Sequence, residues 1–328
     1  MSTFSFDAYV TAALFERSGG AVFALGDGTV RFEDGTSVAA HPDAGALCAV
    51  AHPSGDGIVT GGDDGRLVWT TKAGGAKLLA EVKGKWIETV AASAASGLIA
   101  FGAGREARVL NVADDTFARV FTHDKSVADL AFDNKGLRLA AATYGGAAVW
   151  YARIAEQKPL MLKHAGIHTS VIWSPDGKFL VSALQDAQLH GWRMADGKDM
   201  RMGGYPSKVK AMTFMSGGQI LVTGGAHGTV VWPFTGASGP MGKQAAEIAY
   251  DEHSMVARVA SSDAKGVLLG GREDGRVFCL AMTGNRVVDL HDASGSPITA
   301  LALSPDGAKA AWGDEDGAAG VSDLPPLA

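Results

Sequence analysis

A unit of about 40 to 45 residues recurs along the whole chain, and this repeat constrains the fold more than any other feature. Each copy has an alternating apolar run, a turn rich in Pro, Asp, Asn, Ser and Gly, a second apolar run, a tight turn and a third alternating run. Apolar residues at every second position between turn residues predict short β-strands. Eight copies can be aligned, and they begin at Val10, Leu47, Ile87, Val127, Thr169, Lys210, Val256 and Ile298.

The tight turn of the unit supports the prediction of strands. In several copies it is an Asp-Gly pair, which is typical of two-residue hairpins because glycine accepts a positive φ, as at 27–28, 64–65, 274–275 and 316–317. A short fourth run follows the third, as at 77–82, 117–122, 160–163 and 286–290. Four strands in a period of this length are typical of one β-propeller blade. We therefore expect an all-β protein with eight four-stranded blades; seven blades is the alternative, because the first copy matches the unit least well.

The two ends of the chain suggest how the ring of blades closes. The last copy ends near Val321 without a fourth run, while residues 3–7 (TFSFD) alternate in polarity before the first copy begins. We expect residues 3–7 to supply the outer strand of the last blade. This pairing would remove exposed strand edges, which promote aggregation. Residues 1–328 would then form one propeller domain closed by its N-terminal strand.

Several short motifs resemble the WD-repeat propellers, and together they extend over nearly the whole chain. They are the SPDG turns at 174–177 and 304–307, the G-x-x-D-G runs at 61–65 (GGDDG) and 271–275 (GREDG), the tryptophans that end third runs at Trp69, Trp150, Trp192 and Trp232, and the histidines that end fourth runs at His41, His123, His164 and His291. No Trp-Asp dipeptide occurs, and only Trp192 keeps the usual register, so this would be a divergent member. The resemblance implies a rigid, non-catalytic scaffold that binds peptides or domains on one face around the central channel.

The composition excludes some other classes. The net charge of -6 argues against a nucleic-acid partner, which usually requires a basic surface. Two cysteines, Cys48 and Cys279, are too few for a disulfide framework. The N-terminus lacks the basic and apolar regions of a signal peptide, and no uncharged apolar run approaches the length of a membrane span. We expect a cytoplasmic monomer with no membrane partner.

The nine histidines raise the question of a metal site. Four of them occupy one repeated position, which indicates a structural role in each blade. The others lack the spacing that places two ligands on one strand or helix. We expect no metal and no cofactor, although a site assembled from several blades around the channel stays open.

The distribution of charge indicates where a partner would bind. In this kind of propeller the connection from the fourth strand to the next blade shares a face with the tight turn. On that face, blades three to six carry basic and aromatic residues, and the residues that we expect to contact a partner are Lys83, Lys85, Trp86, Arg105, Lys125, Tyr144, Tyr205 and Lys208, with Lys163 and Lys210 nearby. The turns of blades two, seven and eight are acidic instead, at Asp63, Asp64, Glu273, Asp274, Glu315 and Asp316.

The function expected from these observations is that of an adaptor for an acidic or mixed-charge protein segment. Complementary charge orients a partner, and exposed Trp, Tyr and Arg are enriched at binding hot spots. The alternative is a propeller enzyme or a metal-handling accessory factor with its site at the channel mouth. That alternative requires polar residues near the inner ends of the first strands, where the chain has mostly small or apolar ones: Ala49, Val90, Leu130, Met212 and Leu301.

Overall fold

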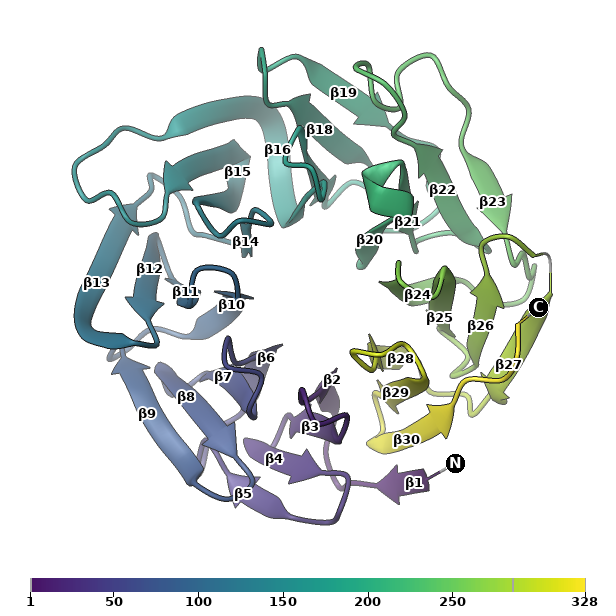
Figure 1. Ribbon diagram of the computed structural model, residues 1–328, viewed down its shortest axis with the longest axis horizontal. Helices are drawn as coiled ribbons and strands as arrows, with labels where there is room; N and C mark the ends of the chain where they lie inside the picture. The colour runs from purple at the N-terminus through teal and green to yellow at the C-terminus, as the bar shows by residue number, and fades with distance from the viewer. Residues whose placement is uncertain (1, 285, 328) are drawn as a thin grey trace.

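The computed structural model describes residues 2–284 and 286–327 and confirms the predicted all-β propeller, with its sheets arranged in a ring around a central axis (Figure 1). Five sheets consist of four consecutive strands: β2 (Val10–Phe15), β3 (Ala21–Leu25), β4 (Thr29–Phe32) and β5 (Ser37–Ala39); β6 (Ala46–Ala51), β7 (Ile58–Gly62), β8 (Arg66–Thr71) and β9 (Gly75–Glu81); β10 (Ile87–Ser93), β11 (Leu98–Ala103), β12 (Glu106–Asn111) and β13 (Asp114–Thr122); β20 (Met212–Met215), β21 (Ile220–Thr223), β22 (Thr229–Pro233) and β23 (Ala246–Ile248); and β24 (Val256–Ser262), β25 (Val267–Arg272), β26 (Val277–Ala281) and β27 (Val287–His291).

The fourth and fifth repeat units are joined in one six-stranded sheet. Its strands are β14 (Asp129–Phe132), β15 (Arg138–Tyr151), β16 (Leu160–Trp173), β17 (Phe179–Leu184), β18 (Leu189–Arg193) and β19 (Asp199–Met202). β15 folds back on itself, since the Ala152 amide donates to the Leu137 carbonyl at 2.9 Å. β16 is then both the outer strand of one unit, pairing with β15, and the inner strand of the next, pairing with β17.

The number of blades differs from the main expectation for this reason. The blades number seven when each continuous hydrogen-bonded sheet is counted as one blade. Seven is the alternative that the sequence left open, and the expectation of eight separate blades is wrong by one. All eight repeat units are present, but two of them share a sheet. The cause lies in residues 163–168 (KHAGIH), where the connection contains one glycine and no Pro, Asp or Asn to end the strand.

The last sheet contains both ends of the chain. β1 (Ser2–Ser5) lies antiparallel to β30 (Ala318–Asp323), beside β29 (Lys309–Asp314) and β28 (Ile298–Leu303). Ser2 pairs with Val321 and Ser5 pairs with Ala318. β1 thus occupies the outer position of this sheet, where the last repeat unit has no strand of its own.

The core lies between neighbouring sheets rather than in one central mass. The second strand of most units is buried along its full length, as in β3, β7, β11, β17 and β25, because each sheet packs against a neighbour on both faces. The innermost strands are also joined from sheet to sheet by side chains. Thr299 Oγ1 donates to the Val10 carbonyl at 2.7 Å, and Thr11 Oγ1 donates to the Ala46 carbonyl at 2.9 Å.

Helical structure is minimal in the described residues. A single 3-10 turn, Ser216–Gly218, links β20 to β21. None of the described residues belongs to a helix long and apolar enough to cross a membrane.

Candidate partner-binding face

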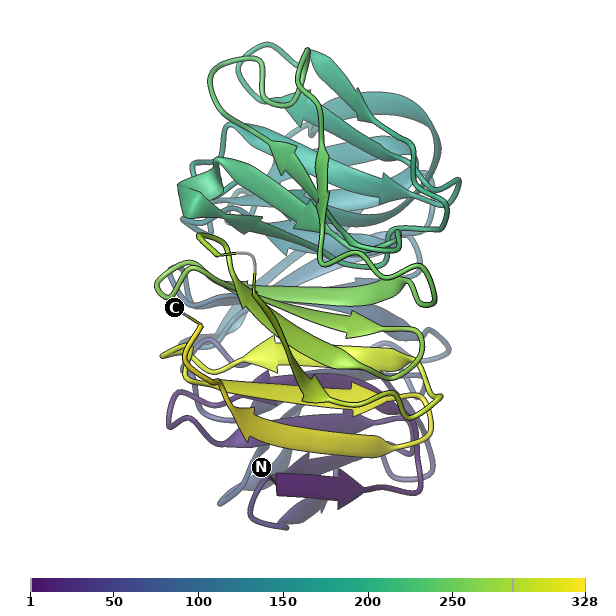
Figure 2. The ribbon, with the colours of Figure 1, turned by 90° about the vertical axis from the view of Figure 1, so that its right-hand side faces the viewer.

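Two kinds of loop meet on one side of the ring, as the sequence analysis assumed. Hydrogen bonds link each connection between units to a tight turn: the Val82 amide donates to the Gly65 carbonyl at 2.8 Å, and the His123 amide donates to the Arg105 carbonyl at 2.9 Å. Figure 2 shows the sheets edge-on with turns and connections gathered on two opposite sides. We call one of these sides the connection face; it comprises the connections 6–9, 40–45, 82–86, 123–127, 163–167, 203–210, 249–255 and 291–297 with the tight turns 26–28, 63–65, 104–105, 144–146, 185–188, 224–228, 273–275 and 315–317.

Most of the predicted contact residues are exposed on this face. Trp86 is 59% exposed and Tyr144 is 61% exposed, high values for aromatic side chains. Lys83, Lys85, Arg105 and Lys125 are exposed as well. The Lys85 side chain extends toward the turn at Gly104, next to Arg105, so segment 82–86 and turn 104–105 form one continuous basic surface.

Lys208 and Tyr205 are more enclosed than expected. Lys208 is half-buried and donates from Nζ to Gln185 Oε1 at 2.8 Å. The Tyr205 hydroxyl lies 2.8 Å from Thr223 Oγ1 and accepts a hydrogen bond from Trp232 Nε1 at 2.6 Å. Burial raises the pKa of Tyr205 to about 12. Tyr205 thus contributes its hydroxyl to the interior of its own sheet, a different role from the exposed contact that we expected.

The structure adds three exposed residues that the sequence analysis missed. Tyr250 is 63% exposed, Ile167 50% and Tyr9 40%. Tyr9 and Trp86 occupy the same position, immediately before an inner strand, so the repeat alignment contained a signal for Tyr9. Ile167 is the cross-strand partner of Tyr144, which gives the six-stranded sheet an exposed apolar pair at this face.

The acidic residues of this face are partly committed to intramolecular contacts. Asp64 Oδ1 lies 3.1 Å from His41 Nδ1 and accepts from the Arg66 amide at 2.9 Å. Asp274 pairs with Arg276 at 2.9 Å. The basic segment 82–86 also lies directly against the turn that holds Asp64, so the division of the face into a basic and an acidic half is incomplete.

The repeated histidines are buried or half-buried at the bases of the connections. His41 Nε2 lies 2.9 Å from Thr60 Oγ1, and His291 stacks on Trp312 with ring centroids 4.0 Å apart. Burial lowers the pKa values of His123, His164 and His291 below that of a free histidine. Among the described residues, no group of three or more His, Cys, Asp or Glu side chains could hold a metal ion.

The polar groups of the innermost strands are engaged between sheets. Asp129 Oδ1 accepts from Thr89 Oγ1 at 3.0 Å, and Asp129 Oδ2 accepts from the Val171 amide at 2.8 Å. Burial raises the pKa of Asp129 to about 6. Arg258 donates from Nε to the Thr299 carbonyl at 2.7 Å. These contacts give Asp129 and Arg258 a structural role in joining neighbouring sheets.

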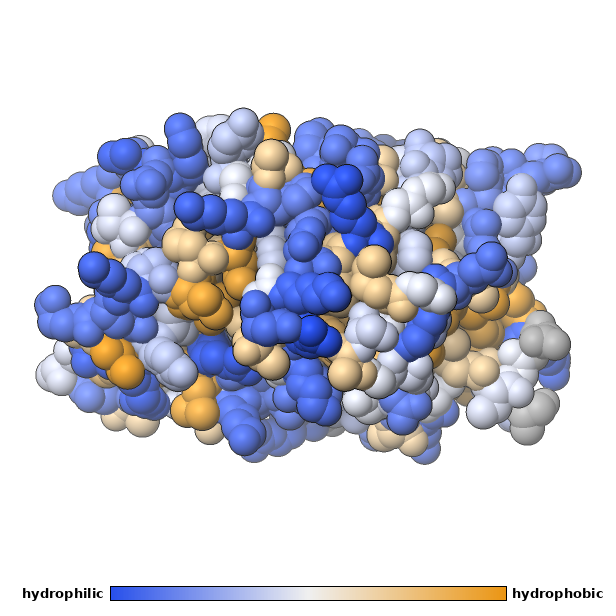
Figure 3. Space-filling model, turned by 90° about the horizontal axis from the view of Figure 1, so that it is seen from above, coloured by the Kyte–Doolittle hydropathy of each residue, from blue (hydrophilic) through white to orange (hydrophobic). Residues whose placement is uncertain are grey.

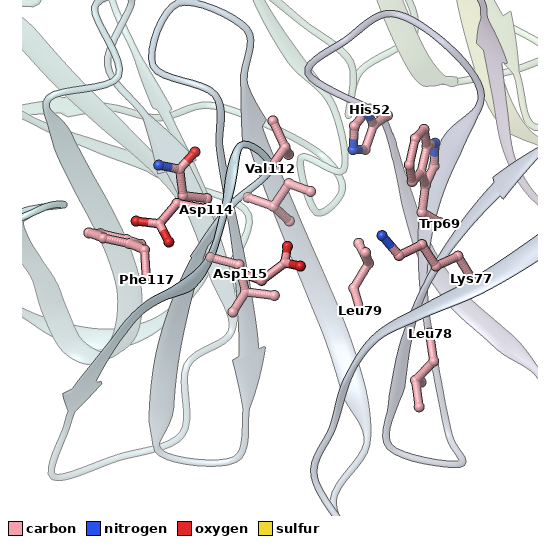
Figure 4. A pocket seen from close by; sticks show the side chains of 12 residues that line it. His52, Trp69, Lys77, Leu78, Leu79, Val112, Asp114, Asp115 and Phe117 are labelled. Carbon is pink, nitrogen blue, oxygen red and sulfur yellow. The ribbon is translucent and has the colours of Figure 1, made fainter.

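A cleft opens on the opposite side of the ring, between the outer parts of β8–β9 and β11–β13 (Figure 4). It encloses about 200 Å³. Trp69 stacks on His52 with ring centroids 4.1 Å apart, and Lys77 Nζ lies 5.9 Å from the Trp69 ring centroid. On the other wall of the cleft, Asp114 Oδ1 accepts hydrogen bonds from the amide and the hydroxyl of Thr116. The cleft has room for one large side chain and contains none of the predicted contact residues.

The outer strands of the sheets also carry exposed apolar residues: Leu78, Val120, Leu160, Met161 and Val287. Figure 3 shows the rim at the top of the ring as small apolar groups separated by hydrophilic side chains. Single exposed apolar residues are normal on a protein surface. The connection face differs in its aromatic residues, since four of the five exposed ones in the described part of the chain lie there, and this makes it the candidate binding surface.

The repeat unit and the ring of sheets define a β-propeller. Residues 158–193 match the family described as WD domain, G-beta repeat, which confirms the resemblance in the unit that contains Trp192. Propellers of this class commonly act as scaffolds for protein interactions and are generally not catalysts.

Solved structures show the same fold over nearly the full length. The chain is similar to the computationally designed Ika8 protein, with a TM-score of 0.79, 21% identity and coverage of 98% of both chains. It is also similar to a chain of the Mitotic Checkpoint Complex, with a TM-score of 0.67, 16% identity and coverage of 99% of this chain and 95% of that one. At these identities the likeness concerns the fold alone. No curated protein matches the sequence significantly.

Proposed function

We propose that this propeller is a non-catalytic adaptor that binds an acidic or mixed-charge protein segment on its connection face, centred on β10–β13 and the six-stranded sheet. One observation carries the proposal. Of the five exposed aromatic residues in the described part of the chain, four lie on this face: Tyr9, Trp86, Tyr144 and Tyr250. Trp and Tyr are enriched at binding hot spots, where their rings offer a partner a large apolar contact area.

The charges on the same face support an acidic partner. Within the described residues, none of Lys83, Lys85, Arg105, Lys125 and Lys163 forms a salt bridge. Their positive charge is therefore available to attract and orient carboxylates. We place this adaptor in the cytoplasm as a monomer, with neither nucleic acid nor membrane as its partner.

The proposal is tested by paired substitutions on the two sides of the ring. Trp86→Ala combined with Arg105→Glu should weaken binding of a purified partner at least about 100-fold, because both a hot-spot ring and a favourable charge are removed. Binding is measured by titration calorimetry with a partner identified by crosslinking through the connection face.

The matched control lies on the opposite side. Tyr151, the last residue of β15, is also an exposed aromatic residue, and Lys158, in the loop that follows, is also an exposed cation. Tyr151→Ala combined with Lys158→Glu should leave the affinity unchanged. Binding that survives the first pair of substitutions, or is lost with the second, would contradict the proposal.

A further inference from the structure

Three histidines contact one another beneath the connection face of the six-stranded sheet. His164 and His168 belong to β16, and His190 belongs to β18. The rings of His164 and His190 stack with centroids 3.6 Å apart, and His164 meets His168 edge-on at 5.5 Å. Trp192 completes the group, with centroids 4.9 Å from His190 and 5.6 Å from His168.

The hydrogen bonds of this group are incomplete. His168 is satisfied, because its Nδ1 lies 2.7 Å from Ser182 Oγ and its Nε2 lies 3.1 Å from the His164 carbonyl. Three other ring nitrogens are buried and have no hydrogen-bond partner within the described residues. They are both nitrogens of His190 and the Nδ1 of His164. A buried donor without a partner lowers the free energy of unfolding by about 1–3 kcal/mol. The packing of the rings therefore stabilises this group, and its hydrogen bonds contribute little.

The charges around the stack act in opposite directions, because Asp199 and Asp186 raise the pKa values of the histidines and Arg201 lowers them, so burial decides the direction. The charged groups that face the stack are Asp199 and Arg201 of β19 and Asp186 of the turn after β17. The nearest carboxylate oxygen, Asp199 Oδ2, is 3.6 Å from His190 Nε2 and lies on an exposed side chain. Burial lowers the pKa values of all three histidines, and repulsion from His164 contributes to the lowered pKa of His190, which is about 4.

The stack is directly connected to the proposed binding surface. His164 lies in segment 163–167, the continuous strand that joins two repeat units. The same segment exposes Lys163 and Ile167, and Ile167 pairs with Tyr144. Movement of the His164 ring away from His190 therefore displaces residues of the connection face.

We propose that His164, His168 and His190 form an acid-sensitive latch: uptake of a proton separates the stack and releases segment 163–167 from β18. Two imidazolium rings cannot remain stacked at this distance, and one imidazolium lacks both water and hydrogen-bond acceptors there. The segment then opens locally while the other sheets stay closed. The consequence for partner binding rests on the function proposed above: acidification weakens the binding of a segment that contacts Tyr144 and Ile167.

Hydrogen exchange on the protein without a partner tests the latch. After correction for intrinsic exchange rates, protection of amides 163–168 should fall at least about 10-fold between pH 7.5 and pH 5, while amides 82–86, a connection without histidine, change less than about 3-fold. His190→Phe keeps a ring against His164 but cannot take up a proton. In that variant the fall at 163–168 should be at least about 3-fold smaller than in the unmodified protein, because only His164 and His168 remain to take up a proton.

The matched control is His291→Phe, because His291 stacks on Trp312 in another sheet. It should leave the pH response of 163–168 as in the unmodified protein. A response of unchanged size in His190→Phe, or one that disappears in His291→Phe, would overturn the proposal.

A second measurement covers the case in which His190→Phe does not fold. Nuclear magnetic resonance of the unmodified protein, with labelled imidazoles, should show His164 and His190 titrating below the free-histidine value of about 6.5 and influencing each other's curves. Independent titration of both rings near that value would refute the latch. Both measurements omit the partner, so loss of the proposed binding function would leave their outcome unaffected.

Discussion

Phe4 of β1 packs against Phe23 of β3, with ring centroids 5.6 Å apart. Phe6 reaches the same ring at 5.7 Å. Backbone pairing attaches β1 to β30, while these rings attach it to the first sheet. The N-terminal strand therefore joins the last repeat unit to the first through two independent sets of contacts.

Deleting residues 1–8 should destabilise the whole propeller, because the deletion exposes the edge of β30 and part of the surface around Phe23. Phe4→Ala should have a smaller effect, about 1–3 kcal/mol, since Phe4 is only half-buried. Thermal unfolding measures both. A melting temperature unchanged by the deletion would show that ring closure does not depend on β1.

Asp129 should make stability depend on pH in an unusual direction. Its folded pKa of about 6 lies above the value of 3.8 for a free aspartate, so the folded state binds more protons than the unfolded state between these values. The cost of burying the carboxylate is therefore fully present above pH 6 and is relieved as the pH falls through the folded pKa.

Two substitutions separate charge from hydrogen bonding at Asp129. Asp129→Asn retains an acceptor for the Val171 amide without the charge, so its stability relative to the unmodified protein should be higher at pH 7.5 than at pH 4.5. Asp129→Ala removes the acceptors for both Thr89 and Val171 and should cost about 1–3 kcal/mol. Urea unfolding at the two pH values measures both; an Asn variant with no relative change would argue against a buried, charged Asp129.

His41 should contribute to stability through its two hydrogen-bonded nitrogens. The ring is fully buried between Thr60 and Asp64. His41→Ala leaves a cavity and two groups without their partner, so we expect a loss of about 2–4 kcal/mol in the free energy of unfolding. The exposed His253 provides the comparison, and His253→Ala should change this free energy by less than about 0.5 kcal/mol. Similar losses in both variants would contradict a structural role for the buried histidine.

Gly65 should be required for the shape of the connection face. Its φ is +76°, and a Cβ there would overlap the carbonyl oxygens of Val82 and Lys85. Gly84 has a similar φ of +69° but open space around it. Gly84→Ala should cost about 1–2 kcal/mol of backbone strain, whereas Gly65→Ala should cost more and shift the amide resonances of segment 82–86. Equal destabilisation by the two changes would show that the close approach at Gly65 is unimportant.

The exposed tyrosines that the sequence analysis missed provide a separate test of the binding face. Tyr250→Ala and Tyr9→Ala should each weaken partner binding by about 5-fold or more if the partner extends beyond the six-stranded sheet. Calorimetry with the same partner measures the change. Unaltered affinity in both variants would confine the contact to the region around Trp86 and Tyr144.

The local features of this protein could be predicted from the order of its residues. Alternating polarity and Asp-Gly turns report the conformation of a few adjacent residues, so the strands, the hairpins and the all-β repeat followed directly from them. An N-terminal strand beside the last unit could also be predicted, because an alternating run and a missing strand were both visible, although the strand spans Ser2–Ser5 rather than residues 3–7.

Contacts between distant residues depended on the folded arrangement. The extension of β16 through residues 163–168 joined two units, although the repeat itself suggested separate blades. Tyr205 turned inward because Thr223 and Trp232 place polar atoms beside its hydroxyl. The stacking of His164 on His190 likewise brings together residues of different strands. A sequence pattern records which side of its own strand a residue occupies, whereas its neighbours across the sheet are set by register and packing.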